Sequence, residues 1–153
     1  MIRKANIDDV KEIHSLLLFY SKQEVLLGRS LSDLYDQIRD FYVATAEGES
    51  RITGACGLHI CWDDIAEVRS LAVKKEFLSA GIGRQLVNAC IDEARQLGIK
   101  KIFVLTYVPD FFKKLGFKPV DKSSLPHKVW ADCVNCVKFP DCDEDAMMLT
   151  ISG

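Results

Sequence analysis

The sequence contains no apolar run long enough to cross a membrane. A bilayer-spanning helix needs about 20 consecutive apolar residues, and charged side chains interrupt every apolar stretch of this 153-residue chain before that length is reached. The opening residues, MIRKANIDD, also lack the apolar core of a secretory signal peptide. We therefore expect a cytoplasmic protein without a membrane partner.

An excess of charge of one sign is absent as well. Lys and Arg together number 20 and Asp and Glu number 22, so the formal net charge is only −2. Binding to nucleic acid depends on clustered Lys and Arg that displace counterions from phosphates. We therefore expect no nucleic-acid partner and favour a small molecule. The length and the 48% content of hydrophobic residues predict one globular domain over residues 1–153.

Cysteine is not scarce, but no secretory signal directs the six cysteines to an oxidising compartment, so we expect reduced thiols. Zinc is an alternative near the C-terminus, where the potential ligands are Cys133, Cys136, Cys142 and His127. Structural zinc sites normally use two closely spaced ligand pairs, and only the first two of these cysteines have that spacing. We favour thiols that close a loop and predict no metal site. Three further cysteines lie at apolar positions and are interpreted as core residues rather than acyl-carrying nucleophiles: Cys56, Cys61 and Cys90.

The apolar periodicity predicts a mixed α/β (or α+β) architecture. Strands are expected at residues 1–4, 41–46, 52–62, 65–73 and 101–107, and a helix is expected over about 83–97. Asn6 and Ser30 begin two further helices as N-caps. The order is strand, two helices, three antiparallel strands, helix, strand, helix, strand. It predicts a central mixed, mostly antiparallel sheet with helices on both faces.

The two N-terminal helices are predicted from apolar side chains that recur on one face of each. The first helix presents Val10, Ile13, Leu17 and Tyr20. The second helix presents Leu31, Leu34, Tyr35 and Ile38. We expect both sets of side chains to be buried.

The most informative segment joins the strand at 65–73 to the helix at 83–97 through the loop FLSAGIGR at residues 77–84. A glycine turn at the start of a helix gathers backbone N–H groups that have no partner within the helix, and the helix dipole adds partial positive charge there. Such a point suits a pyrophosphate. The loop is not a P-loop, because no Gly-Lys-Ser/Thr follows it, and a Rossmann fingerprint would need glycine where Leu86 stands.

A second motif lies one strand downstream, where Phe112 is followed by Gly116 and Phe117 in the pattern aromatic-x-x-x-Gly-Phe. Together the two motifs resemble the acetyl-CoA motif and the aromatic signature of the GNAT N-acetyltransferases, and the order of elements matches that family. The resemblance implies a GNAT fold and acetyl-CoA as the acetyl donor. It also implies cofactor contacts from the strand backbone, the glycine loop and the aromatic motif, namely Leu71, Ala72, Val73, Leu78, Ser79, Ala80, Gly81, Ile82, Gly83, Arg84 and Phe112.

Two positions depart from the broad superfamily pattern. The pyrophosphate motif usually begins with Arg or Gln followed by Gly, whereas this chain has Leu78, Ser79 and Ala80, so backbone donors remain but the polar side chain does not. The aromatic motif commonly supplies a tyrosine that protonates the departing thiolate, and Phe112 has no proton to give. Tyr107, at the end of the preceding strand, is the nearest candidate acid. Water as the acid, with Tyr107 as a core aromatic, is the alternative.

Acetyl transfer to an amine needs a base that frees the nitrogen lone pair. Glu67 is the candidate, because it lies eleven positions before Leu78, as does the glutamate base in the histone-acetylating branch of the superfamily. The alternative is an ion pair of Glu67 with Arg69 or Arg84, with ordered water as the base. Strict alternation along the strand would place a charged pair and two apolar residues on one face: Glu67, Arg69, Leu71 and Val73.

A narrower resemblance is to short, single-domain N-acetylglutamate synthases. It is carried by LLGRS at residues 26–30, AEVRSLAV at 66–73 and LTY at 105–107, and phenylalanine at position 112 is usual in that branch. It implies L-glutamate as the acetyl acceptor, in the first step of arginine biosynthesis, by direct transfer in a ternary complex. A substrate with two carboxylates needs cationic partners. The candidate substrate residues are Arg29, Ser30, Arg69 and Lys128.

Other functions stay open at this point. The same fold and cofactor would serve another amino acid, a polyamine or a protein N-terminus as acceptor. The chain would alternatively be a non-catalytic acetyl-CoA sensor, which binds acetyl-CoA without turnover. Loss of Arg29 and Arg69 would matter little for a cationic acceptor. Assembly as a homodimer is also open.

Overall fold

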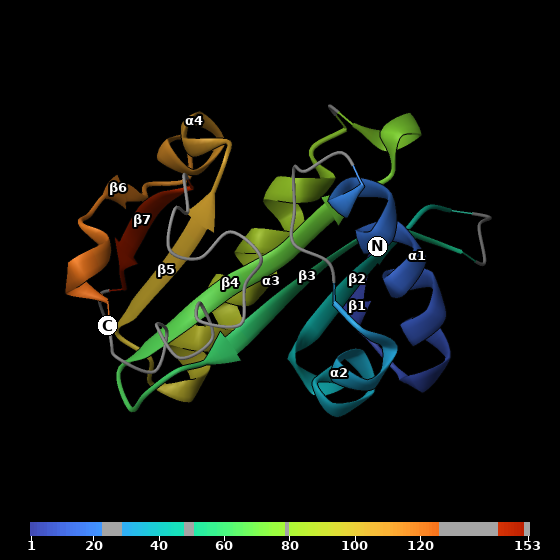
Figure 1. Cartoon of the computed structure of the whole chain (residues 1–153), viewed down its shortest axis with the longest axis horizontal. Helices are drawn as coiled ribbons and strands as arrows, with labels where there is room; N and C mark the ends of the chain where they lie inside the picture. Colours follow the sequence, from blue (N-terminus) through green and yellow to red (C-terminus); the bar gives the residue numbers. More distant parts are fainter. Residues whose placement is uncertain (23–28, 48–50, 79, 126–143, 152–153) are drawn as a thin grey trace. The chain divides into compact units, whose positions relative to one another are not determined.

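The computed structural model describes residues 1–22, 29–47, 51–78, 80–125 and 144–151 (Figure 1). Its strands are β1 Ile2–Lys4, β2 Phe41–Thr45, β3 Ile52–Ile60, β4 Ile65–Val73, β5 Lys101–Thr106, β6 Lys118–Pro119 and β7 Asp145–Thr150. Its helices are α1 Val10–Ser21, α2 Leu31–Asp36, α3 Ile82–Leu97 and α4 Pro109–Lys113, and its 3-10 turns are η1 Ile7–Asp9, η2 Ile38–Asp40, η3 Lys75–Phe77 and η4 Lys122–Ser124. Apart from the two-residue strand β6, the predicted order of elements is confirmed.

The strands form one sheet in the order β1-β2-β3-β4-β5-β7-β6. The pairs β1–β2, β2–β3, β5–β7 and β6–β7 are antiparallel, and β4–β5 is parallel. A parallel pair needs a long crossover, and α3 supplies it between β4 and β5. The predicted mixed, mostly antiparallel sheet of the α/β class is confirmed.

The chain divides into two compact units, Met1–Leu58 with Val68–Glu93 and His59–Glu67 with Ala94–Gly153, which we call the N-terminal and the C-terminal unit. Each unit is described by itself. The organisation of residues 1–153 as a single domain stays a prediction.

The core of the N-terminal unit is built from one face of α1 and the strands it covers. Val10, Ile13 and Leu17 are fully buried, which confirms the stripe predicted for the first helix. Tyr20, at the end of the same helix, is half-buried and packs against this core. The rest of the cluster comes from α1, α2, β2, β3 and β4, namely Leu16, Leu34, Phe41, Val43, Ile52, Ala55 and Ala72.

The prediction for the second helix is wrong in part. Ser30 caps α2 as expected, because its Oγ accepts the Asp33 N–H at 3.1 Å. Leu34 is fully buried, but Leu31 is 38% exposed and Tyr35 is 41% exposed. Helix α2 ends after 6 residues, before the turn η2 begins. A helix of fewer than two turns presents too short a face to bury the whole predicted stripe.

The C-terminal unit is built around β5. This strand pairs in parallel with the start of β4, from Ile65 opposite Lys101 to Glu67 opposite Phe103. It pairs antiparallel with β7 along its whole length. The core beneath comprises Cys61, Ile65, Phe103, Leu125 and Ala146. The strand that carries Glu67 is therefore anchored to the middle of this unit.

The three cysteines predicted to be core residues are buried, and that prediction is confirmed: Cys56, Cys61 and Cys90. The Cys90 thiol donates to the Cys56 Sγ at 3.8 Å. This hydrogen bond, together with burial, raises the pKa of the Cys56 thiol well above its usual value. Cys56 is thus held as a thiol, which is the wrong form for a nucleophile. The candidate zinc ligands lie outside the described residues: His127, Cys133, Cys136 and Cys142.

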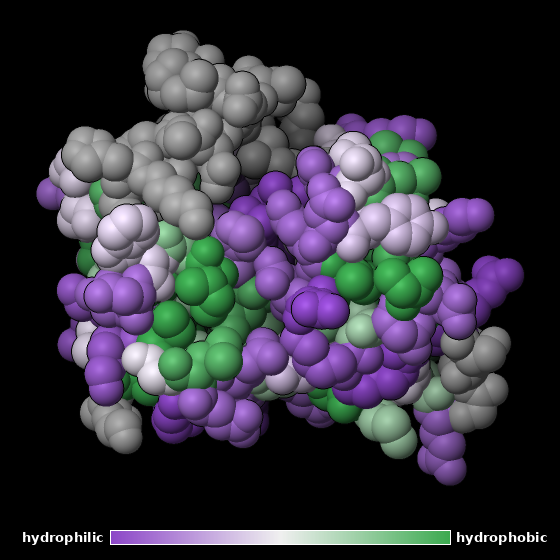
Figure 2. All heavy atoms as spheres, turned by 90° about the horizontal axis from the view of Figure 1, so that it is seen from below, coloured by the Kyte–Doolittle hydropathy of each residue, from purple (hydrophilic) through white to green (hydrophobic). Residues whose placement is uncertain are grey.

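Hydrophilic side chains predominate on the face shown in Figure 2, and hydrophobic ones form separate patches there. Large apolar side chains that are more than half exposed include Trp62, Leu97, Leu78 and Val108. In the part of the chain that the structure describes, no helix is long and apolar enough to span a bilayer.

Candidate active site

Strand β4 carries the candidate base and several candidate cofactor contacts, but it is not regular. Ser70 has a φ of 58°, in the left-handed region that residues other than glycine seldom adopt. Such a residue interrupts the two-residue alternation of side chains along a strand. The prediction that Glu67, Arg69, Leu71 and Val73 share one face is therefore wrong beyond Ser70, because counting by two does not carry across the distorted residue.

Arg69, the residue before this distortion, is buried and held in place within the N-terminal unit. Its Nη2 donates to the Gln37 Oε1 at 2.6 Å. Gln37 lies at the end of α2, the short helix that Ser30 caps. A buried guanidinium with a defined orientation is suited to grip a carboxylate with two parallel hydrogen bonds. The sequence named Arg69 as a candidate, but it contained no signal for Gln37.

The backbone of β4 has one edge that faces β3 and an opposite edge, which pairs with β5 from Ile65 to Glu67. We call this second edge of β4 the outer edge. The Lys74 N–H donates to the Thr53 carbonyl of β3 at 2.8 Å. In a trans peptide the carbonyl points opposite to the N–H, so the Val73 carbonyl points to the outer edge. Strand geometry directs the backbone of Leu71 to the same side and that of Ala72 toward β3. Of the three predicted backbone contacts, Leu71 and Val73 therefore present groups to the outer edge.

The predicted pyrophosphate loop places a left-handed glycine at the start of α3. Gly81 has a φ of 79°, and among the described residues no atom beyond its neighbours lies within 4 Å of the place a Cβ would take. Its carbonyl accepts the Gln85 N–H at 3.1 Å, which begins the helix. The first N–H groups of a helix have no partner within it. Those of Ile82, Gly83 and Arg84 therefore remain the predicted donors to a pyrophosphate.

In the predicted pyrophosphate loop, the expected hydrogen-bond donors to the anion are backbone N–H groups rather than side chains. Leu78, Ala80 and Arg84 are exposed, and the Ala80 N–H donates to the Phe77 carbonyl at 3.4 Å. Ser79 lies outside the described residues. An exposed apolar Leu78 cannot donate a hydrogen bond, so the missing polar side chain of the motif is not replaced at that position.

Gly54 of β3 has a role that the sequence analysis missed. A Cβ at this position would lie 3.1 Å from the Ala72 carbonyl oxygen, 3.1 Å from Leu86 Cδ1 and 3.2 Å from Ile82 Cγ2. These distances are tighter than ordinary Cβ contacts, so a side chain at this position would push against β4 and the start of α3, and glycine avoids this. Gly54 thereby contributes to the position of the helix start that is predicted to bind the pyrophosphate. A glycine inside a strand pattern was the available signal.

Glu67, the candidate base, lies in the C-terminal unit and is half-buried. It occupies the last of the three parallel pairs between β4 and β5, opposite Phe103. Phe112, the aromatic residue of the second motif, is buried and packs edge-on against Phe111 and Phe117, with ring centroids at 5.0 and 5.3 Å. Phe112 is therefore part of an aromatic cluster. Its contact with the cofactor stays a prediction.

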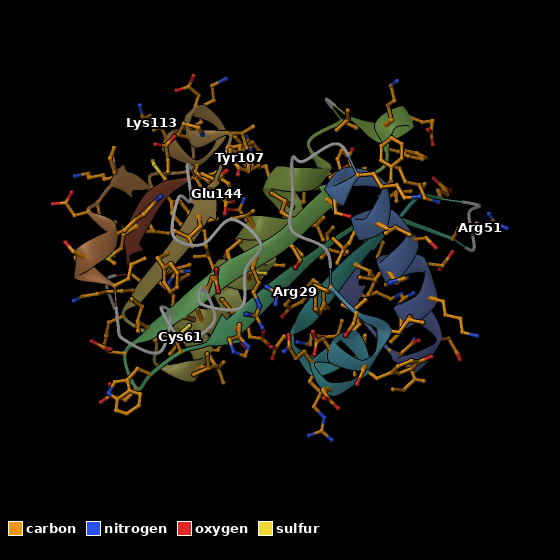
Figure 3. All side chains as sticks on the ribbon, in the orientation of Figure 1. Arg29, Arg51, Cys61, Tyr107, Lys113 and Glu144 are labelled. Atoms are coloured by element: carbon orange, nitrogen blue, oxygen red, sulfur yellow. The ribbon has the colours of Figure 1, made fainter. Side chains whose placement is uncertain are left out.

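Tyr107, the candidate acid, follows the last residue of β5 and is half-buried. The β5–β7 ladder ends with Thr106 opposite Asp145. Tyr107 follows Thr106 in the chain, and Glu144, which is buried, precedes Asp145. Figure 3 labels both residues at the end of β5 that leads to α4. No motif in the sequence singles out Glu144.

The remaining candidate substrate residues are only partly described. Arg29 is half-buried and belongs to the N-terminal unit, as does Arg69 (Figure 3). Ser30 is exposed, and its hydroxyl oxygen caps α2. Lys128 lies outside the described residues. The structure thus keeps two arginines in one compact unit and leaves Lys128 as a prediction.

The outer edge of β4 and the glycine-started helix α3 are the elements predicted to bind an extended ligand with an anionic group, as in transferases that use coenzyme A. The sequence matches the Acetyltransferase (GNAT) family over residues 7–117. This match covers well over half of the chain, and the chain belongs to the GNAT family of acetyltransferases. Its acetyl donor is acetyl-CoA, as predicted.

Curated relatives place the chain within this family. An uncharacterized N-acetyltransferase of Chlorobaculum tepidum is 38% identical over 150 residues, which cover 98% of this chain and 96% of that protein. The amino-acid acetyltransferase of Mycobacterium tuberculosis is 30% identical over 131 residues, or 85% of this chain and 75% of that protein. The amino-acid acetyltransferase of Photorhabdus laumondii is 34% identical over 82% of this chain, which is only 28% of that protein.

Solved structures agree in fold. A Mycobacterium tuberculosis protein in complex with CoA and NLQ has a TM-score of 0.86 at 27% identity and covers 99% of both chains. An N-acetylglutamate synthase from Neisseria gonorrhoeae, complexed with coenzyme A and N-acetyl-glutamate, has a TM-score of 0.89 at 25% identity. That match covers all of this chain and 35% of the synthase. The predicted GNAT fold is confirmed.

Proposed function

We propose that this protein transfers the acetyl group of acetyl-CoA to the α-amino group of L-glutamate, giving N-acetylglutamate for arginine biosynthesis. The observation that carries the proposal is the likeness of the whole chain to a synthase solved with coenzyme A and N-acetyl-glutamate, at a TM-score of 0.89. The similarity to amino-acid acetyltransferases over 82% and 85% of the chain supports it at the level of sequence.

Recognition of glutamate requires cations for its two carboxylates. Arg69 is the first candidate, because its burial and its hydrogen bond to Gln37 fix the guanidinium before substrate arrives. Arg29, in the same unit, is the second candidate, and Lys128 is the third. Ser30 contributes by capping α2, the helix that ends at Gln37.

Catalysis is assigned to Glu67 and Tyr107. Glu67 removes a proton from the α-ammonium group, and the freed amine attacks the thioester carbonyl carbon. A C–N bond forms as the C–S bond breaks, and Tyr107 gives its proton to the departing thiolate. The second proton lost by the nitrogen returns to the Tyr107 oxygen, so that both the amide and the free thiol of coenzyme A are neutral. The proposed transfer is direct, in a ternary complex. The burial of Cys56 and Cys90 and the raised pKa of Cys56 support this by disfavouring an acyl-enzyme on either thiol.

A second candidate function is acetylation of an acceptor that carries more positive charge than glutamate. The Chlorobaculum tepidum relative, at 38% identity, has a name that specifies no acceptor and is compatible with either function.

The test is acetyl-CoA-dependent thiol release with a panel of acceptors: L-glutamate, L-glutamine, L-aspartate, L-lysine and a polyamine. It is repeated with Arg69→Ala and Glu67→Gln, and with Arg51→Ala as the matched control. Arg51 is an exposed arginine of the N-terminal unit with no assigned role (Figure 3). Removing one charged partner of a carboxylate should raise the KM for glutamate at least tenfold in Arg69→Ala.

Selective turnover of glutamate that is weakened in Arg69→Ala and kept in Arg51→Ala would support the proposal. Preference for lysine or the polyamine, with Arg69→Ala as active as the parent, would favour the second candidate. Binding of acetyl-CoA without turnover of any acceptor would favour a sensor over both enzymes.

A further inference from the structure

Tyr20 connects helix α1 to the strand that faces the cofactor. It is the penultimate residue of α1, is half-buried, and packs edge-on against Phe19 with ring centroids 5.1 Å apart. Its hydroxyl donates a hydrogen bond to the Val73 carbonyl, the last carbonyl of β4. The two residues are 53 positions apart in the sequence, and both belong to the N-terminal unit.

The direction of the Val73 carbonyl shows on which side of β4 the hydroxyl lies. The Lys74 N–H points to Thr53 of β3, so the carbonyl of the same peptide points to the outer edge of β4. The Tyr20 hydroxyl must therefore lie at that outer edge, next to the C-terminal end of the strand. The glycine turn at Gly81 follows within ten residues of this point.

A tyrosine hydroxyl that donates one hydrogen bond still has lone pairs that accept another. Burial and the nearby Glu76 carboxylate raise the pKa of Tyr20 above its usual value, so the hydroxyl keeps its proton around neutral pH. The group at the outer edge is therefore a neutral donor and acceptor rather than a charge. Such a group suits an amide N–H and is less suited to a phosphate.

We propose that Tyr20 is a cofactor-binding residue, whose hydroxyl donates to the Val73 carbonyl and accepts an amide N–H from the pantetheine arm of acetyl-CoA. This proposal rests on the assignment of the outer edge of β4 to the pantetheine arm. It does not depend on which amine accepts the acetyl group. It adds one side-chain contact, from α1, to the backbone contacts that β4 is expected to make with the cofactor.

The experiment compares two ligands with Tyr20→Phe, which removes only the hydroxyl. Calorimetry measures the dissociation constants of coenzyme A and of adenosine 3′,5′-bisphosphate, which carries phosphates but no pantetheine arm. Tyr35→Phe is the matched control, because Tyr35 is an exposed tyrosine of the same unit with no assigned role. We expect Tyr20→Phe to bind coenzyme A about three- to tenfold more weakly, the effect of one neutral hydrogen bond, and to bind the bisphosphate as the parent does.

Tyr35→Phe should bind both ligands as the parent does. With any acceptor that is turned over, Tyr20→Phe should raise the KM for acetyl-CoA and leave kcat at saturation within about twofold. Equal weakening of both ligands would show that Tyr20 only supports the fold and would overturn the proposal. Unchanged or tighter binding of coenzyme A by Tyr20→Phe would overturn it as well. Because binding is measured without an acceptor, failure of the glutamate assignment leaves this result interpretable.

Discussion

Arg3 and Asp9 form a two-pronged ion pair that joins β1 to the start of the first helix. Arg3 Nη1 donates to Asp9 Oδ2 at 2.7 Å, and Arg3 Nη2 donates to Asp9 Oδ1 at 3.0 Å. The same carboxylate accepts the Asn6 N–H at 2.8 Å. Asn6 in turn caps the helical turn, with its Oδ1 accepting the Asp8 N–H at 3.0 Å, which confirms the predicted N-cap. One buried carboxylate therefore serves both the cap and the sheet.

Replacing Asp9 by Asn should destabilise the protein in a pH-dependent way. Burial raises the pKa of Asp9, but the hydrogen bonds from Arg3 and from the Asn6 backbone, together with the charge of Arg3, outweigh it, so the pKa lies below its usual value. We expect Asp9→Asn to lower the free energy of unfolding by about 1–3 kcal/mol at pH 7. A lowered pKa stabilises the fold above the unfolded-state value of about 3.9 and ceases to do so as pH falls through the folded-state value.

Denaturant unfolding of parent and Asp9→Asn at pH 7 and pH 3 measures this effect. The difference between the two proteins should shrink at pH 3. Asp8→Asn is the control, since Asp8 is exposed and acts in the cap through its backbone. An Asp9→Asn difference that is equally large at both pH values would contradict the ion-pair explanation.

Replacing Gly81 by Ala should weaken cofactor binding as well as stability. A left-handed φ costs a residue with a Cβ about 1–2 kcal/mol, and the strain falls on the turn that aims the first N–H groups of α3. Gly98→Ala is a matched control, because Gly98 has a φ of 85° with open space around it at the other end of α3. Thermal unfolding should show similar losses in both variants, and calorimetry should show weaker coenzyme A binding only in Gly81→Ala. Equal affinity in the two variants would argue against an anion site at Gly81.

Replacing Gly54 by Ala should destabilise the N-terminal unit through overpacking. The new Cβ would meet the Ala72 carbonyl oxygen and Leu86 Cδ1 at 3.1 Å, and overpacking of this kind costs about 1–3 kcal/mol. At Gly57 the nearest atom, Phe41 Cζ, would lie at 3.3 Å, so Gly57→Ala should cost less. Chemical denaturation ranks the two variants. The reverse order would show that the backbone at Gly54 moves away easily and does not set the position of α3.

Replacing Tyr107 by Phe tests the assignment of the general acid. Loss of a general acid lowers the rate of the chemical step by about a hundredfold or more. We expect kcat to fall by that factor in Tyr107→Phe while the KM for acetyl-CoA changes little, because the ring is kept. Tyr35→Phe should have the kcat of the parent. A Tyr107→Phe enzyme with parent-like kcat would assign proton donation to water and leave Tyr107 as a core aromatic.

Much of the secondary structure was predictable because it depends on neighbours in the sequence. The stripe of Val10, Ile13 and Leu17 predicted a buried helical face, and that face is buried. Asn6 and Ser30 predicted two caps, and both accept backbone N–H groups. The glycine loop predicted a helix start that Gly81 provides with its positive φ. Each of these features involves residues only a few positions apart, so residue types and their spacing in the sequence are enough to predict it.

The failures have a common cause in the geometry of a distorted or shortened element. The alternation of side chains along β4 is interrupted at Ser70, which has a left-handed φ. This was not predictable, because serine has no special preference for a left-handed φ inside a strand. The stripe of the second helix fails at Leu31 and Tyr35, because α2 ends before a full face develops. Both β4 and α2 exist where they were predicted. The side-chain alternation of β4 and the length of α2 depend on the packing around them.

The sequence by itself determined the GNAT motifs, the order of strands and helices, and the residue types from which an acetyl-CoA site is made. Only the tertiary structure decided which backbone groups of β4 face away from β3, and that Tyr20 meets Val73 from 53 positions away. It alone paired Arg69 with Gln37 and placed Thr106 of β5 opposite Asp145 of β7. Local patterns arise from bonded neighbours, whereas these relationships arise from the close packing of distant segments, which spacing along the chain does not encode.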